Sequence, residues 1–220
     1  LSYFAQDGIV ARDKSHFDRI TYRLNATGTF GFFKLGGNVN LANIKNMGID
    51  PNSHFGLSLD QALNMPPIVP VKFSDGTWGT PEAYGIGLQE ITNPVALMSY
   101  NNSKWRTNKL IGGLYGEVDF GKFSKALEGL TFRSSFGGEY ALVMNDSYTP
   151  YYYLDAMHFT TSDRASKSMQ LYTRWNFENI LTYARRIDVH NFTLMAGTTA
   201  YKDMYENLSA SKADLIFDDF

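Results

Sequence analysis

The clearest pattern in the sequence is a strict alternation of apolar and polar side chains over residues 19–41. Ile20 and Leu24 fall on one side of an extended chain, and Arg23 falls on the other. The alternation breaks at residues 29–32 and then resumes. A period of two on both sides of a short break predicts a tight antiparallel β-hairpin.

The same alternation recurs along the chain and predicts seven β-strands. The connections between them differ in length. Short turns are expected near Thr29, Lys125 and Asp188, whereas long loops are expected at residues 43–107 and 143–167, and again after Lys202. The predicted strands cover residues 1–10, 19–28, 33–42, 108–120, 130–140, 168–183 and 191–201.

The first long loop contains local structure of its own. Residues 55–64 have helical spacing, and this helix must end before Pro66, because proline cannot continue a helix and restricts the residue before it. Residues 73–78 contain Asp75-Gly76, a sequence typical of a small hairpin turn. Loops of this length are uncommon in compact domains and are usually functional.

Two architectures fit seven amphipathic strands. In a soluble sandwich the apolar face packs in a core, whereas in an outer-membrane barrel it meets lipid and the polar face meets a wet lumen. The regular change between short turns and long loops favours the barrel. Aromatic residues near the short turns also fit an interfacial girdle, although aromatics flank turns in other β-proteins: Phe30, Phe32, Phe33, Phe120, Phe123 and Tyr183.

Composition excludes several classes of protein. Apolar residues make up 44% of the chain, yet no apolar run approaches the roughly 18 residues that a membrane-spanning helix needs. The formal net charge of −2, with both signs scattered, argues against a nucleic-acid partner. The chain has no Cys, which leaves its compartment open, and its 16 Phe, 14 Tyr and 19 Gly favour strands and tight turns.

No catalytic or metal-binding motif stands out, so we expect neither an enzyme nor a bound cofactor. The four histidines are far apart and lack metal-ligand spacing. Glu117, Asp119, Glu139 and Glu178 lie on polar faces of predicted strands, which suits a wet lumen better than acid/base catalysis. A glycosidase remains an alternative, because carboxylates distant in the sequence can still pair in space.

Aromatic residues in the expected loops are the best candidates for binding a ligand. Sugar rings stack on flat apolar faces while nearby polar groups bond their hydroxyls. The competing interpretation is that these rings pack within the loops. The candidates are Trp78, Trp105, Tyr151, Tyr152 and Tyr153.

Several segments together resemble the barrel of SusC-like TonB-linked outer membrane receptors of Bacteroidetes (the RagA/SusC family). Met65-Pro66-Pro67 and Asn93-Pro94-Val95-Ala96 are weak alone, but the segments occur in the family's order and cover nearly the whole chain. They are residues 17–25, 34–40, 62–67, 70–71, 75–79, 87–96 and 175–183.

This resemblance implies a 22-stranded transmembrane β-barrel closed by a plug, located in the outer membrane and contacting its lipid. It also implies a SusD-like surface lipoprotein as partner, energy from TonB and import of an oligosaccharide or peptide nutrient. The chain lacks the family's plug and TonB-contacting segment, so residues 1–220 are expected to be part of the barrel domain, cut within a loop near Phe220. The family expectation directs one set of charged strand residues toward the lumen or plug: Arg19, Arg23, Lys34, Arg133, Arg174 and Glu178.

The alternative from a different class is a soluble β-sandwich, either a carbohydrate-binding or an adhesin module that uses the Tyr-rich loop. The loop aromatics could equally pack against the lipoprotein partner.

Overall fold

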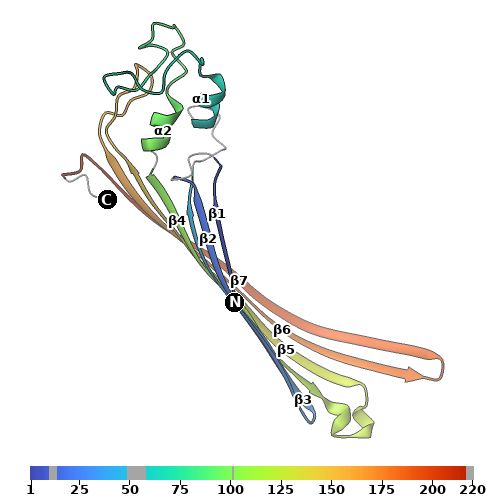
Figure 1. The fold of residues 1–220 in the computed structure, drawn as a ribbon. Coiled ribbons are helices and arrows are strands. Elements are labelled where there is room, and N and C mark those ends of the chain that lie inside the picture. The colour runs from blue at the N-terminus through green and yellow to red at the C-terminus, as the bar shows by residue number, and fades with distance from the viewer. Residues whose placement is uncertain (10–13, 49–57, 101, 217–220) are drawn as a thin grey trace.

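The computed structural model describes residues 1–9, 14–48, 58–100 and 102–216. These residues form one seven-stranded antiparallel sheet in which each strand pairs with its neighbours in the sequence. The sheet is long and strongly twisted, and the loops that carry the two short helices gather at one end of it (Figure 1). No helix in this part of the chain is long and apolar enough to cross a membrane.

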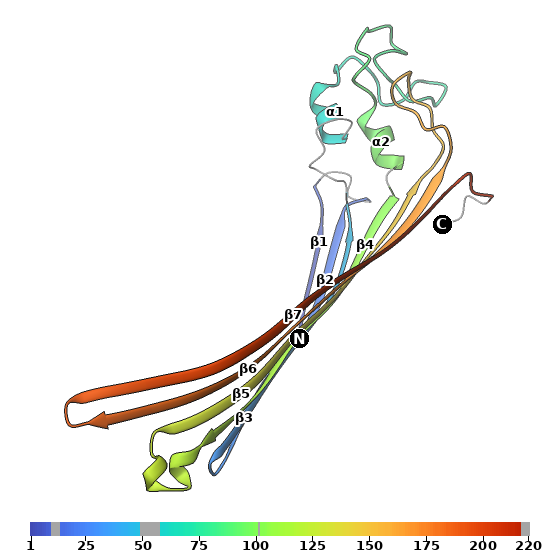
Figure 2. The same ribbon diagram turned by 180° about the vertical axis from the view of Figure 1, so that it is seen from behind.

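The strands are long, and the β6–β7 hairpin extends beyond its neighbours at the end opposite the helices (Figures 1 and 2). The strands are β1 Ser2–Asp7, β2 His16–Phe30, β3 Phe33–Met47, β4 Asn102–Asp119, β5 Leu130–Thr149, β6 Arg164–Ile187 and β7 His190–Ala213. The helices are α1 Ser58–Asn64, α2 Pro94–Tyr100 and the 3₁₀ turns η1 Phe120–Lys122 and η2 Lys125–Leu127.

The register places most of the apolar side chains of the long strands on one face of the sheet. Leu24 pairs with Val39, for example, and Leu114 pairs with Phe136 and Phe136 with Phe177. Partners in register lie on the same face. We call this set the apolar band: Tyr22, Leu24, Phe30, Phe33, Leu35, Val39, Leu41, Leu110, Leu114, Val118, Phe132, Phe136, Tyr140, Leu171, Trp175, Phe177, Leu181, Leu194 and Ala200.

The apolar band has no second layer against it. Leu24 is 69% exposed, Leu114 67% and Phe136 49%, and the buried apolar side chains of the described segments are few. A sandwich would bury these residues between two sheets about 10 Å apart. The single sheet therefore weighs against the sandwich alternative.

All seven predicted strands are confirmed, but the predicted loops are too long. The first begins after Met47 rather than at residue 43, and the second spans only residues 150–163. Residues after Lys202 were expected to form a loop, yet β7 continues to Ala213 and pairs with β6 throughout. The strands run past the apolar band into regions where both faces are polar, so the alternation fades before the strand ends.

The helix and the small hairpin predicted within the first long loop are both present in the described residues. A helix is present at Ser58–Asn64, while Phe55, the predicted start of its apolar side, lies outside the described residues. The small hairpin is confirmed by the Lys72–Trp78 bridge and by Gly76, whose φ of 87° suits the turn. The N-terminal strand is shorter than predicted, and Val10 is also outside the described part.

The opposite end of the sheet gathers aromatic rings around the short turns. Phe32 in the β2–β3 turn lies 4.0 Å from Phe123, measured between ring centroids, and Phe123 lies 6.3 Å from Phe120. Lys122 Nζ donates to the carbonyl of Gly31 at 2.9 Å, which joins the two adjacent turns. The predicted aromatic clustering at this end is confirmed.

Candidate functional site

The long loops form a folded unit above the sheet, centred on Asn93. This side chain is 1% exposed. Its Nδ2 donates to the carbonyls of Val71 at 2.7 Å and Gly79 at 2.8 Å, and its Oδ1 accepts from the amides of Val95 and Ala96 at 3.0 Å each. Asn93 thus caps α2 and also joins it to the small hairpin between Val71 and Gly79.

Gln61 provides a second buried connection in the same unit. Its Oε1 accepts from the Thr92 amide at 2.6 Å, and its Nε2 donates to the Glu90 carbonyl at 3.1 Å. Gln61 belongs to α1, and Thr92 directly precedes the cap of α2. The loop therefore holds both helices together through buried side-chain amides rather than through a large apolar core.

Asn93→Ala is expected to loosen this unit without unfolding the sheet. The change removes the side-chain partner of the Gly79 carbonyl and of two helix amides, and one of the two bonds to the Val71 carbonyl, which still accepts from the Gly79 amide. Each lost bond of this kind costs about 1 kcal/mol or more. Hydrogen exchange of the full-length protein should show faster exchange over residues 66–100 and unchanged exchange in β5.

Asn64→Ala is the matched control, because Asn64 is exposed and bonds only to Asp60. Equal exchange rates in the Asn93→Ala and Asn64→Ala proteins would contradict the central role of Asn93.

A chain of aromatic side chains connects the two long loops. Trp78 Nε1 donates to the Tyr100 hydroxyl at 3.0 Å, and the Tyr100 ring stacks on Tyr152 with 4.6 Å between centroids and 7° between planes. Lys72 Nζ lies 4.3 Å from the centroid of the Trp78 ring, a cation–π contact. Glu82 adds a further link between the loops by accepting from the Ala156 amide at 3.2 Å.

The pKa values of two side chains in this unit, Tyr152 and Asp75, are shifted from their ordinary values. Burial raises the pKa of Tyr152, with smaller contributions from Tyr100 and Asp155. Hydrogen bonds from the hydroxyl and the amide of Thr77 hold the pKa of Asp75 below its ordinary value. Tyr152 is therefore neutral and Asp75 ionised at neutral pH.

Asp155 organises the second loop. It is 3% exposed, and its Oδ1 accepts from the amides of Met157 and His158 at 3.0 and 2.8 Å, while His158 Nδ1 lies 2.7 Å away. A short bridge between Tyr153 and Phe159 closes the loop. Across the described residues, no group of three or more potential ligands could hold a metal ion.

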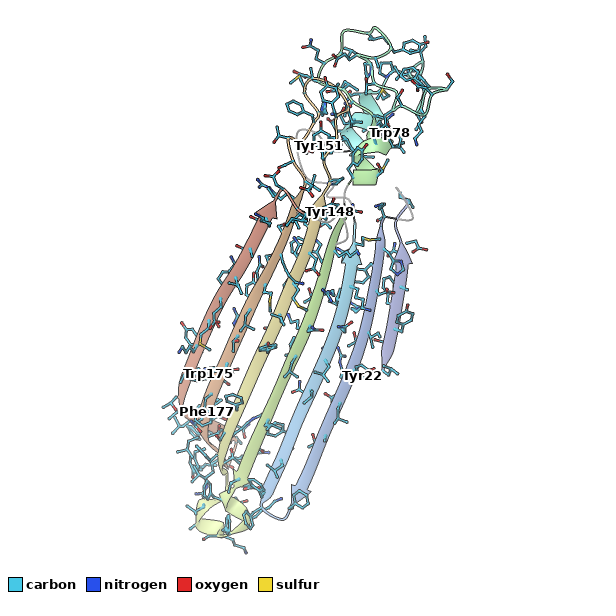
Figure 3. The ribbon with its side chains drawn as sticks, turned by 90° about the vertical axis from the view of Figure 1, so that its left-hand side faces the viewer. Tyr22, Trp78, Tyr148, Tyr151, Trp175 and Phe177 are labelled. Carbon is cyan, nitrogen blue, oxygen red and sulfur yellow. The ribbon has the colours of Figure 1, made fainter. Side chains whose placement is uncertain are left out.

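Four of the five aromatic residues predicted to bind a ligand lie in the loop unit, in two different environments. Trp78 and Tyr152 meet through Tyr100, whereas Tyr151 and Tyr153 are 65% and 63% exposed. Figure 3 shows Trp78 and Tyr151 within the loop unit, and Tyr148 at the adjoining end of the sheet.

Trp105 was predicted to lie in a loop, and this is wrong. It belongs to β4, which begins at Asn102, and it pairs with Asn46 and Asn145 on the polar face. The role of all five residues in binding stays a prediction. The sequence reasoning missed Tyr100, although an aromatic residue in the same long loop was a visible candidate.

The polar face of the sheet carries rows of alternating charge. One row in register contains Arg23, Glu139, Arg174 and Asp203, separated in places by uncharged residues. Arg174 Nε donates to Asp203 at 2.7 Å. Lys109, one step along the strands, lies 2.6 Å from Glu139. Opposite charges side by side keep this face polar with little net charge.

A second row brings Lys34, Glu117 and Arg133 into register. The Arg133 guanidinium lies 4.1 Å from the centroid of the Tyr115 ring. Tyr115 in turn lies flat over Gly36, where an added Cβ would collide with its ring. The expected common face is confirmed for the charged set named from the sequence: Arg19, Arg23, Lys34, Arg133, Arg174 and Glu178.

Among the comparisons with known proteins, only the comparison with solved structures found matches, and these support the architecture. No protein-family model matches the chain, and no curated protein does either. Solved structures of the RagAB peptide importer do match. In its 'closed-closed' state the TM-score is 0.76 at 18% identity over 98% of this chain, and in its 'open-open' state 0.74 at 19% over 96%.

This chain has the fold of part of the RagAB importer. A further structure, of the RagAB peptide transporter, gives a TM-score of 0.75 at 18% identity. The chain spans only 23 to 24% of the length of the RagAB chains that it matches. The resemblance to RagA/SusC-type receptors is therefore confirmed for the fold.

Proposed function

We propose that this chain is a barrel segment of a TonB-dependent outer membrane transporter, which takes up short peptides or glycans together with a SusD-like surface lipoprotein. The single observation that carries the proposal is the apolar band on an uncovered face of a sheet with the RagAB fold. Contiguous apolar patches of this extent are rare on soluble proteins. A lipid bilayer would cover the band without a second protein layer.

The height of the apolar band fits a membrane. On β3 the band runs from Phe33 to Leu41, which is roughly 27 Å along the strand at about 3.3 Å per residue. A strand tilt of about 40° reduces this to roughly 20 Å, close to the apolar height of about 25 Å in outer-membrane barrels. Lys45 on the same face then lies beyond the band.

The connections support one orientation. The three hairpins close through short turns at one end of the sheet, and the two long loops lie together at the other (Figure 1). Outer-membrane barrels have short periplasmic turns and longer extracellular loops. We therefore assign the Asn93-centred unit to the cell exterior, where a lipoprotein partner and incoming nutrients would meet it.

The polar face and the loops support a proposal about the substrate class. Rows of alternating charge present both donors and acceptors, which suits peptides as well as sugars. The RagAB structures are of a peptide importer, and this favours peptides as the first substrates to test. We propose that the exposed rings of Tyr151 and Tyr153 contact the nutrient before it enters the lumen.

Uptake by cells that carry the gene for the full-length protein provides the test. Deletion of the gene is expected to abolish uptake of labelled peptides or of labelled oligosaccharides, and the complemented strain should lose it again when the proton-motive force is collapsed. Tyr151→Ala with Tyr153→Ala should lower the apparent affinity by about tenfold, since each lost ring contact is worth about 0.5–1.5 kcal/mol.

Phe123→Ala serves as the control in the same assay, because Phe123 is also exposed but lies at the short turns. Full-length protein recovered as a soluble species, or uptake unchanged by the deletion, would overturn the proposed function.

A further inference from the structure

Near the long loops, the face that carries the apolar band changes from apolar to positively charged side chains. In register beyond the band, apolar residues give way to cations on β3, β4 and β6. We call these cations the basic belt: Lys45 on β3, Lys104 and Arg106 on β4, and Lys167 on β6. All four side chains are exposed, and they line much of a groove of about 820 Å³.

The acidic residues near the basic belt neutralise only part of it. Asp146 accepts from Arg106 Nη2 and lies 3.1 Å from Lys167 Nζ, so one carboxylate serves two cations. Asp18 is bonded by Tyr3 and by His16, each at 2.9 Å. Lys45 and Lys104 form no ion pair within the described segments, although each has an aspartate as a register partner: Asp18 opposite Lys45 and Asp146 opposite Lys104. The four cations of the belt therefore outnumber these two carboxylates.

The two unpaired lysines stand close together. Lys45 is the register partner of Arg106, and Lys104 lies two residues before Arg106 on the same face. Cβ atoms of such partners are about 5 Å apart, so three cations surround one small area. A phosphate group would supply the missing negative charge, because ammonium and guanidinium groups bind phosphate with short charge-assisted bonds.

The residues around the basic belt favour a phosphorylated lipid over a free phosphate ion. Met144 is the register partner of Arg106 on one side and of Met169 on the other, and Leu110 begins the apolar band four residues beyond Arg106. A ligand held here meets cations at one end and, beyond the hydrogen-bonded pair Asn43 and Asn108, the apolar side chains of the band. A free phosphate ion would use only the cations, whereas a phosphorylated lipid would use both.

From this geometry we propose that the basic belt binds the phosphorylated headgroup of an outer-leaflet membrane lipid, whose acyl chains lie along the apolar band. The inference rests on the proposed function, because it requires this face to be turned toward the membrane. The belt fixes the depth of the strands in the bilayer and places the lipid beside the Asn93-centred unit.

Native mass spectrometry of the full-length protein in detergent, with bis-phosphorylated lipid A as the probe, tests this proposal. Lys45→Gln with Lys104→Gln is expected to weaken binding by about thirtyfold, about fivefold for each lysine near a lipid surface. Lys34→Gln with Lys125→Gln removes the same charge from the polar face and a short turn, and binding should be unchanged.

Two further arms identify the bound group. Dephosphorylated lipid A should bind the unmodified protein at least tenfold more weakly, and inorganic phosphate at the same concentration should not displace the lipid. Equal binding of both lipids, displacement by inorganic phosphate, or no effect of the belt variant would overturn the proposal. A species that migrates faster on a gel before heating than after it shows, in each sample, that the barrel has formed. If this species is absent, the result counts against the proposed function and not against lipid binding by the basic belt.

Discussion

Arginine in place of Phe136 is expected to destabilise the full-length protein by about 2 to 4 kcal/mol, because a guanidinium near the middle of the apolar band must be taken into hydrocarbon. Phe136 is 49% exposed and lies in register between Leu114 and Phe177. Its ring also contacts Trp175 at 6.4 Å between centroids. Urea-induced unfolding in phospholipid vesicles, followed by tryptophan fluorescence, measures the change.

Two controls separate a lipid-facing surface from a protein core. Ser135→Arg places the same side chain one residue away on the polar face, in register with Glu178, and should change the free energy of unfolding by less than about 1 kcal/mol. Met144→Arg lies beside the basic belt, where the cost should also fall to about 1 kcal/mol or less. Equal costs at Phe136 and Met144 would indicate a protein core rather than a bilayer.

Cysteine labelling on intact cells is expected to give an all-or-none contrast between the two ends of the sheet. In the full-length protein, Tyr151→Cys should react with a membrane-impermeant maleimide, since Tyr151 lies in the second long loop and is 65% exposed. Lys125→Cys, in the β4–β5 turn, should react only after the outer membrane is permeabilised. Successive antiparallel strands alternate in direction, so the two kinds of connection cannot share a side.

Labelling is best compared in cells that lack the lipoprotein partner, so that it cannot shield the loops. The natural chain has no Cys in residues 1–220, which gives a clean background over this segment. Reaction at residue 125 with protection at residue 151 would reverse the assigned orientation.

The strands could be predicted because lipid or core on one side and water on the other enforce a period of two. That signal holds from Ile20 to Leu41, where the sheet has one apolar face, and it fails beyond Asn43. There the same face carries Lys45, and polar residues occupy both sides of the strand. The strand ends are fixed by backbone pairing with neighbours, which side-chain polarity does not report.

The loop unit was less predictable, because its order depends on contacts between distant residues. Trp78, Tyr100 and Tyr152 meet only when both loops fold against each other. One local signal was nevertheless readable: Asn93 followed by Pro94 is a favourable cap and first residue of a helix, and α2 begins there.

The order of the strands also determines how the sheet can assemble. Every pairing joins neighbours in the sequence, so β2–β3, β4–β5 and β6–β7 can each close as an independent hairpin. Joining β3 to β4 requires closure of residues 48–101, about five times longer than the β4–β5 turn, at an added entropic cost of roughly 1.5 kcal/mol. Because Asn93 and Gln61 fold that segment upon itself, they shorten the free chain to be closed, and so this long loop promotes the joining of two hairpins.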